Sequence, residues 1–183
     1  MENIILTGFM GTGKSTLGFH LARKLSMGFI DLDSLIEEEA GLSVSEIFRD
    51  LGEERFRALE REAVRSVVSG EHGHGIVLAT GGGTVADPES SALLKGWGHI
   101  ICLRASIETI LERTGRGAEE EKGKRPLLDM DDREAEIKRL LGERESAYSI
   151  CDMSIDTSVE SVSAVVQKIC DFIEARAEHG PSH

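Results

Sequence analysis

Short apolar runs alternate along the chain with longer segments in which apolar residues recur at helical spacing. Continuous apolar runs of this kind are typical of strands that are buried on both faces of a parallel sheet. Their alternation with helices predicts an α/β doubly wound fold, in which helices cover the sheet. The pattern leaves the order of the strands open. The predicted strands cover residues 3–7, 28–32, 75–79, 99–103 and 153–155, and the predicted helices cover residues 14–25, 34–39, 43–50, 53–68, 88–94, 106–113, 131–148 and 159–175.

Length and charge narrow the class of protein. The chain has 183 residues, which fits one domain with one core. We expect this domain to span residues 1–177, followed by a disordered tail at residues 178–183. The formal net charge of -12 argues against a protein that binds nucleic acid or an anionic membrane surface, because both would be repelled. A phosphate ligand is still compatible with this charge, because a local group of N–H donors and cations can outweigh the average.

The chain carries no sequence sign of export or of a membrane span. Residues 1–7 contain no basic segment, and the apolar run at residues 4–6 is too short to cross a bilayer. The cysteines, Cys102, Cys151 and Cys170, form no Cys-x-x-Cys pair, which indicates small buried residues in a reducing compartment. We therefore expect a cytoplasmic protein, and we expect it to be a monomer.

The strongest motif in the chain is a phosphate-binding loop. Residues 8–15 match G-x-x-x-x-G-K-[ST] in full, directly after a predicted strand and at the start of a predicted helix. Glycines let successive N–H groups point at phosphate oxygens, and the helix N-terminus adds partial positive charge. Lys14 can reach the β- and γ-phosphates, the Ser15 hydroxyl can bind Mg²⁺, and Thr16 is a weaker candidate. The motif predicts binding of ATP and Mg²⁺ by Gly11, Thr12, Gly13, Lys14, Ser15 and Thr16.

Two carboxylates end the second predicted strand, in Asp31-Leu32-Asp33. Residues two apart on a strand point to the same face, so we expect both side chains beside the phosphate-binding loop. One carboxylate can join the shell of the metal, and the other can orient an acceptor hydroxyl and accept its proton. The alternative is a solvated strand end with an aspartate that caps the next helix.

Glycines and arginines supply the remaining candidates. Gly81-Gly82-Gly83 follows the third predicted strand and suits a wall where the backbone approaches a ligand closely, although a flexible turn is the alternative. Phosphoryl transfer needs cations around the transferred charge, and a small carboxylate substrate needs the planar fork of arginine. A lone arginine on a helix is usually a solvated surface residue, so spacing alone selects none of the candidates, which include Arg55, Arg57, Arg113, Arg125 and Arg144.

Taken together, the motifs resemble those of the shikimate kinase family over nearly the whole chain. The phosphate-binding loop by itself is common to many nucleotide-binding proteins. The combination of Asp-x-Asp, Gly-Glu-x-x-Phe-Arg at residues 52–57 and the triple glycine is far more specific. The motifs that carry the resemblance are residues 8–16, 31–33, 52–57, 81–83, 125–128 and 144–148.

The resemblance implies a fold and an activity. The fold resembles that of nucleoside monophosphate kinases, with a five-stranded parallel sheet in the order 2-3-1-4-5. Substrate-binding helices at about residues 34–62 and a mobile lid at about residues 115–126 would move inward over the ligands. The implied activity is transfer of the γ-phosphate of ATP to the 3-hydroxyl of shikimate.

The resemblance also implies a role for each motif residue. Asp33, Arg57 and Arg144 match the positions that bind shikimate, and Asp33 matches the candidate base. The three glycines at residues 81–83 match the substrate-side wall. Ser15 and Asp31 match the magnesium positions, the latter through water. Arg125 matches the lid arginine that reaches the phosphates. The implied catalytic residues are therefore Lys14, Asp33 and Arg125. Arg113 matches an arginine that lies against adenine.

Two departures from the family pattern concern the nucleotide side. The lid contains an additional acidic run, Glu119-Glu120-Glu121, and residues 158–161 read Ser-Val-Glu-Ser where the family often carries a basic residue and a proline near the adenine.

Two other functions stay open: a related small-molecule kinase such as a gluconate kinase, and a nucleotide-binding regulatory module without transfer activity. The presence of Asp33, Arg57 and Arg144 argues against the second of these.

Overall fold

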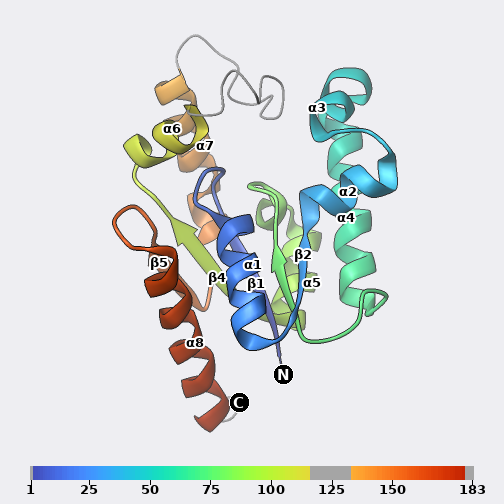
Figure 1. Cartoon of the computed structure of the whole chain (residues 1–183). Coiled ribbons are helices and arrows are strands. Elements are labelled where there is room, and N and C mark those ends of the chain that lie inside the picture. Colours follow the sequence, from blue (N-terminus) through green and yellow to red (C-terminus); the bar gives the residue numbers. More distant parts are fainter. Residues whose placement is uncertain (1, 116–132, 180–183) are drawn as a thin grey trace.

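A five-stranded parallel sheet forms the centre of the protein, in the order β2-β3-β1-β4-β5 (Figure 1). The computed structural model describes residues 2–115 and 133–179. Both the parallel sheet and the strand order implied by the family resemblance are confirmed. The strands are β1 (Asn3–Gly8), β2 (Gly28–Asp31), β3 (Ile76–Ala79), β4 (Gly98–Arg104) and β5 (Met153–Asp156). Each strand begins and ends within one residue of its predicted bounds.

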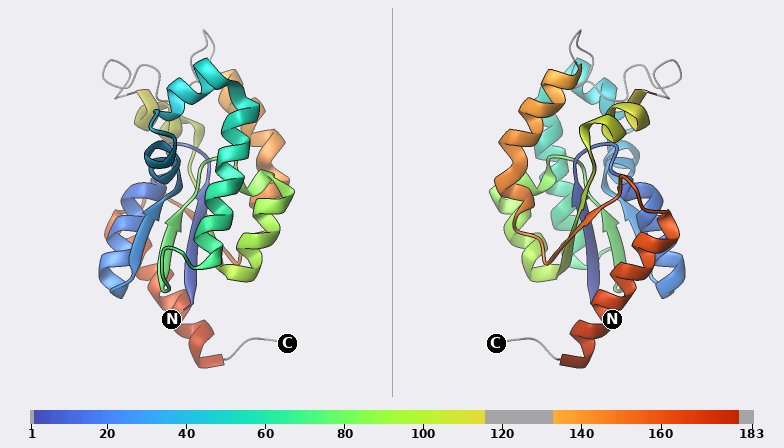
Figure 2. Two further views of the ribbon diagram at one scale, coloured as in Figure 1. Left: turned by 90° about the vertical axis from the view of Figure 1, so that its right-hand side faces the viewer. Right: turned by 90° about the vertical axis from the view of Figure 1, so that its left-hand side faces the viewer.

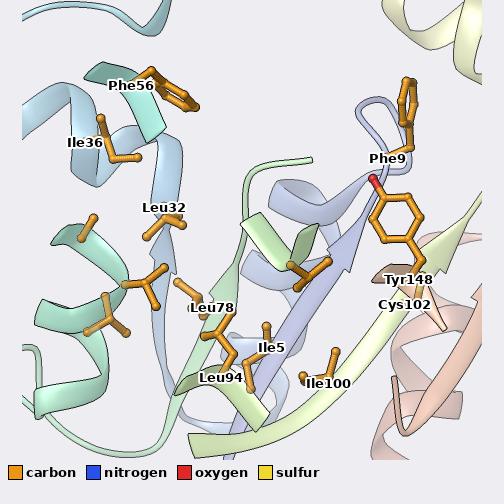
Figure 3. Close-up of a cluster of buried hydrophobic side chains, with 14 of the residues drawn as sticks. Ile5, Phe9, Leu32, Ile36, Phe56, Leu78, Leu94, Ile100, Cys102 and Tyr148 are labelled. Atoms are coloured by element: carbon orange, nitrogen blue, oxygen red, sulfur yellow. The ribbon is translucent and has the colours of Figure 1, made fainter. Parts of the chain in front are cut away.

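Helices cover both faces of this sheet, as Figure 2 shows in its two edge-on views. Alternate residues of each strand point to opposite faces and bury two separate clusters. On one face Ile4 and Leu6 pack with residues of α1 and α8, and on the other Ile5 packs with residues of the remaining helices (Figure 3). The helices are α1 (Lys14–Leu25), α2 (Leu32–Ala40), α3 (Val44–Glu46), α4 (Gly52–Ser69), α5 (Pro88–Trp97), α6 (Ile107–Gly115), α7 (Arg133–Tyr148) and α8 (Val162–His179).

The end of the second strand differs from its prediction. The strand stops at Asp31 and α2 begins at Leu32, so Asp31 and Asp33 do not lie on one strand. Asp31 caps the helix instead, and its Oδ1 accepts hydrogen bonds from the backbone N–H groups of Asp33 (3.1 Å) and Ser34 (3.4 Å). These N–H groups have no partner within the helix, which makes aspartate a favourable residue at this position. The capping role, which the sequence left as an alternative, is therefore correct for Asp31.

Two helical segments also differ from prediction. The segment predicted as one helix over residues 43–50 begins with the expected capping box of Ser43 and Glu46, but a π-helical turn, η1 (Ile47–Leu51), follows and leads into α4 at Gly52, whose φ is 83°. The last helix starts at Val162 rather than at residue 159, because Asp156 and Ser158 first form a side-chain-to-backbone turn. It continues to His179, so the first two residues of the predicted tail are helical.

Three neighbouring strands end together at the edge where the motifs begin. The register pairs Leu6 of β1 with Ala79 of β3, and Ala79 with Asp31 of β2. The segments that follow these strands therefore start side by side. A short 3-10 helix, η2 (Thr84–Ala86), follows the triple glycine. Among the described residues, no helix is both long and apolar enough to span a membrane.

Candidate active site

The candidate site lies at the carboxyl edge of β1, β2 and β3, where open α/β sheets commonly bind their ligands. The phosphate-binding loop follows β1, the aspartates follow β2 and the triple glycine follows β3. Two helices, α4 and α7, contribute arginines to the same region. The motifs at residues 8–16 and 144–148, which are far apart in the sequence, thus meet at one edge of the sheet.

The phosphate-binding loop has the backbone shape that its glycines predict. Gly8 has a φ of 132°, and a Cβ there would lie 2.1 Å from the carbonyl oxygen of Leu103. Gly13 has a φ of 92° and is the N-cap of α1, so no side chain occupies the helix N-terminus. The first N–H groups of α1 are thereby left for an anion, together with the partial positive charge of the helix.

Lys14 bends over its own loop. Its Nζ donates hydrogen bonds to the carbonyl oxygens of Gly8 (2.9 Å) and Phe9 (3.0 Å). Burial lowers the pKa of Lys14 to about 8, against the opposing effect of the Asp33 and Asp31 carboxylates. A bound phosphate would favour the charged form of this lysine, so the site is built to gain an anion.

The remaining loop residues divide into structural and accessible positions. Thr12 is buried and its hydroxyl donates to the Phe9 carbonyl (2.7 Å), so it shapes the loop. Ser15 and Thr16 are exposed in the first turn of α1. Within residues 2–115 and 133–179, no three His, Cys, Asp or Glu side chains gather as a metal site. The exposed Ser15 hydroxyl fits Mg²⁺, which keeps several waters and binds through one or two protein ligands and phosphates.

Asp33 lies in the first turn of α2 and reaches the glycine wall. A Cβ at Gly81 would lie 3.1 Å from Asp33 Oδ1. Burial and, to a smaller extent, the neighbouring Asp31 carboxylate raise the pKa of Asp33 to about 6, against the opposing effect of Lys14. A carboxylate with this pKa is ionised at neutral pH and is more basic than an ordinary aspartate, which suits a group that accepts a proton.

Arg57 is held in place by carboxylates on its own helix. Its Nη1 donates to Glu60 Oε2 (2.8 Å) and its Nη2 donates to Glu53 Oε1 (3.1 Å). Glu60 is only 1% exposed, and its other oxygen accepts a hydrogen bond from the Thr84 hydroxyl (2.6 Å). A Cβ at Gly83 would lie 2.8 Å from Arg57 Nη1, so the glycine wall and this guanidinium are in contact.

Arg144 approaches the same wall from α7. Its Nη1 donates to the Gly82 carbonyl (3.1 Å), and its guanidinium carbon lies 5.9 Å from the centre of the Phe9 ring. The residue is 8% exposed. The two arginines therefore contact consecutive glycines, Gly82 and Gly83, and two guanidinium groups face one region next to Asp33 and the phosphate-binding loop.

Arg113 lies on the other side of the loop, away from the glycine wall. Its guanidinium donates to the carbonyl oxygen of Gly11 (3.2 Å) and to both oxygens of Thr157 (3.0 and 2.5 Å). A cavity of about 220 Å³ opens there. Its lining includes Gly13, Thr16, Leu17, Arg113, Thr157 and Glu160. Arg125 and the lid that was predicted at residues 115–126 fall, apart from Gly115, outside the described residues.

Comparison with known proteins adds the family. The family model described as shikimate kinase matches residues 10–174. The chain belongs to the shikimate kinase family. A shikimate kinase of Geobacter sulfurreducens is 48% identical over 174 residues, which cover 94% of this chain and 91% of that protein. A shikimate kinase of Thermus thermophilus is 45% identical and covers 96% and 91%. A solved shikimate kinase of Acinetobacter baumannii in complex with shikimate has a TM-score of 0.88 and 34% identity, covering 96% and 94%.

Two residues of this shikimate kinase family member were not assigned a role from sequence. Glu60 holds Arg57, and the Tyr148 hydroxyl donates to the same Gly82 carbonyl as Arg144 (2.5 Å). A signal for Glu60 does exist, because it stands in the helical series of buried positions that includes Phe56, Ala63 and Val64. An acid within an apolar helix face, three residues from an arginine, predicts a buried ion pair.

Proposed function

We propose that the protein is a shikimate kinase that transfers the γ-phosphoryl group of ATP to the 3-hydroxyl of shikimate. The observation that carries this proposal is the pair of guanidinium groups, Arg57 and Arg144, at Gly83 and Gly82 beside the phosphate-binding loop. A relative of 34% identity has been solved in complex with shikimate. Membership of the family supports the same reaction.

On the donor side, the loop from Gly11 to Thr16 holds the phosphates of ATP. The N–H groups at the start of α1 bind phosphate oxygens, and Lys14 leaves its own loop carbonyls to bind the β- and γ-phosphates. Ser15 would hold Mg²⁺ directly and Asp31 through water. The chemistry that Mg²⁺ supplies when bound is neutralisation of charge on the phosphate oxygens.

On the acceptor side, Arg57 and Arg144 bind the carboxylate of shikimate. Guanidinium forks form paired, charge-assisted hydrogen bonds with carboxylates, which fixes orientation as well as position. Gly81, Gly82 and Gly83 form the wall against which the ring lies. Holding the acceptor in one orientation next to the γ-phosphate turns part of the binding energy into rate.

Asp33 acts on the reacting hydroxyl. Its carboxylate accepts the proton of the 3-hydroxyl as that oxygen forms its bond to the γ-phosphorus, while the bond between the γ-phosphorus and the bridging oxygen breaks and ADP leaves. The raised pKa of Asp33, about 6, makes it a stronger base than an ordinary aspartate while leaving it ionised at neutral pH.

The remaining assignments extend this proposal. Arg125 contacts the transferred phosphate from the lid at about residues 115–126, and Arg113 lies against the adenine, both by analogy with the family. Residues 1–177 form a single kinase domain, in which the segment at about residues 34–62 moves on acceptor binding. We propose a cytoplasmic monomer, and the free thiols of its three cysteines are compatible with a reducing compartment.

The decisive experiment measures ADP release with ATP and Mg²⁺ in the presence of shikimate, quinate, gluconate or no acceptor. Turnover with shikimate alone supports the proposal. Turnover only with gluconate keeps the kinase fold and the donor site but replaces the acceptor. ATP binding without turnover on any acceptor indicates a regulatory module instead.

A further inference from the structure

The carbonyl oxygen of Gly82 accepts two hydrogen bonds from one helix. The Tyr148 hydroxyl donates to it at 2.5 Å, and Arg144 Nη1 donates to it at 3.1 Å. The two donors are four residues apart on α7, so their side chains lie on the same face of the helix. Tyr148 is 5% exposed, and it belongs to the apolar cluster on this side of the sheet.

The Gly82 segment also contacts the phosphate-binding loop. A Cβ at Gly82 would lie 3.4 Å from the backbone nitrogen of Met10 and 3.8 Å from the Gly8 carbonyl. Phe9, whose carbonyl accepts from Lys14, carries the Arg144 guanidinium over its ring. Phe9 and Tyr148 line one cavity, and Figure 3 shows the Tyr148 hydroxyl directed toward the loop that carries Phe9.

We propose that Tyr148 is a positioning residue for the acceptor, which acts by fixing the Gly82 carbonyl and through it the guanidinium of Arg144. The inference rests on the proposed function. Arg144 uses one edge of its planar guanidinium on Gly82, so the position of that carbonyl decides which N–H groups remain for the acceptor carboxylate. The tyrosine hydroxyl restrains the carbonyl from a second direction, and its rigid buried ring restrains the hydroxyl.

The hydroxyl is suited to this task over a wide pH range. Burial raises the pKa of Tyr148 to about 12, although the nearby Arg144 has the opposite effect. The group therefore keeps its proton and stays a donor under all conditions in which the enzyme is assayed. The hydroxyl takes no part in proton transfer to the acceptor, because it donates its proton to the hydrogen bond with the Gly82 carbonyl.

The first test is the variant Tyr148→Phe, which keeps the ring and removes only the hydroxyl. Loss of one such hydrogen bond predicts a rise of about three- to tenfold in the KM for shikimate. The KM for ATP and kcat should each stay within about twofold, because the loop and Asp33 keep their own contacts. The control is Ile169→Val, which lightens the core on the other face of the sheet and should lower stability without changing either KM.

A double-mutant cycle with Arg144→Lys shows whether Tyr148 acts through Arg144. If it does, adding Tyr148→Phe to Arg144→Lys raises the KM for shikimate by less than about twofold further. Full additivity of the two effects, an unchanged KM in Tyr148→Phe, or equal increases in both KM values would each overturn the inference. Absence of shikimate turnover in the unmodified protein would overturn the proposed function itself, before any variant is compared.

A second measurement does not require the Tyr148→Phe variant. Tyr148 is the only tyrosine in the chain, so growth on 3-fluorotyrosine places a single fluorine reporter beside Gly82. Its ¹⁹F resonance should move when shikimate is added to the protein and should stay in place in the Arg144→Lys variant. If the ¹⁹F resonance of the active fluorotyrosine-labelled protein, with Arg144 in place, does not shift when shikimate is added, the proposal is contradicted.

Discussion

The proposed acceptor side and the proposed nucleotide-base side of the candidate site are built in different ways. On the acceptor side, Arg57, Glu60, Arg144 and Tyr148 are buried or half-buried and bind one another or the glycine wall. On the base side, Glu160 is paired with Lys168 (2.6 Å), whose side chain is 52% exposed, and Val159 is 91% exposed. The acceptor side is interlocked, whereas on the base side the loop at residues 158–161 borders solvent next to the buried Thr157.

This difference predicts where the enzyme is specific. Hydrogen bonds in a buried network support one another, and removal of one member leaves another polar group without its partner. Exposed ion pairs contribute little, because water replaces them readily. We therefore expect strict recognition of the acceptor and looser recognition of the donor base, and the largest mutational effects on the acceptor side.

The largest effect is expected for Asp33→Asn. The amide cannot accept the hydroxyl proton, so kcat should fall by about two to four orders of magnitude, while the affinity for ATP changes little. The measurement is steady-state turnover together with nucleotide binding. Asp87→Asn is a matched control, because Asp87 caps α5 outside the site and asparagine caps equally well. Undiminished turnover would remove Asp33 from the mechanism.

The next largest effect is expected at Glu60, one of the two carboxylates that pair with Arg57. Glu60→Gln removes the buried partner, and we expect the KM for shikimate to rise about tenfold or more, because the arginine loses a charge-assisted hydrogen bond. Glu53→Gln makes the same chemical change on the same arginine at a side chain that is 56% exposed. Its effect should stay within about twofold. Equal effects of the two substitutions would contradict the contrast between buried and exposed pairs.

Glu60 also shows how far the sequence leads. Apolar periodicity located every strand within one residue, because a buried parallel strand has a strong and local pattern. The phosphate-binding loop was equally clear, since its glycines and lysine are adjacent in sequence. Tyr148 was missed because its partner, the Gly82 carbonyl, lies on another element. The pair of Glu60 with Arg57 has a local signal on α4, but the second partner of Glu60, the Thr84 hydroxyl, lies on another element and has none.

The aspartates after β2 show a second limit. Asp31 and Asp33 do lie close enough to Lys14 to influence its pKa, but the spacing argument was wrong, because the two residues do not lie on one strand. Strand and helix compete at such a junction, and the capping bonds of Asp31 start the helix one residue after it. Local hydrogen bonds of this kind shift the boundary of an element without changing which residues meet in the site.

The pH dependence gives the third prediction. Because the pKa of Asp33 is about 6 and that of Lys14 is about 8, kcat/KM for ATP should rise through pH 6 and fall above pH 8. At pH 5 the loss should be about tenfold. With saturating ATP, the upper limb of kcat should move to higher pH, since phosphate oxygens favour protonated Lys14.

The raised pKa of Asp33 also means that this residue contributes less to the stability of the folded protein at neutral pH than at acidic pH. The pKa of Asp33 is raised on folding, so its contribution to stability is present below the ordinary aspartate pKa and is lost as the pH rises through about 6. Asp33→Asn removes this titration. The variant should therefore be more stable than the parent at pH 8, and its stability should not fall as the pH rises through about 6. Thermal unfolding at pH 4 and pH 8 measures the difference. An unaltered pH dependence of stability would place the titration elsewhere.

The smallest effect is expected at the nucleotide base. Glu160 lines the cavity beside Arg113, but its partner Lys168 is exposed and its pairing contributes little. Glu160→Gln should therefore change the KM for ATP by less than about twofold and the ratio of turnover with ATP and GTP by less than about threefold. Steady-state kinetics with both nucleotides at saturating shikimate provide the measurement.

Thr157→Val is the informative comparison on this side of the site. The Thr157 hydroxyl is buried within hydrogen-bond distance of Arg113 (3.0 Å) and of the Thr12 carbonyl (3.0 Å), so its loss should raise the KM for ATP more than the loss of the Glu160 charge. If Glu160→Gln changed the KM for ATP by more than about tenfold, the Glu160 charge would matter more than the Thr157 hydroxyl, against this prediction. The base side would then be as selective as the acceptor side, and the exposed loop at residues 158–161 would be a true recognition element rather than a solvated edge.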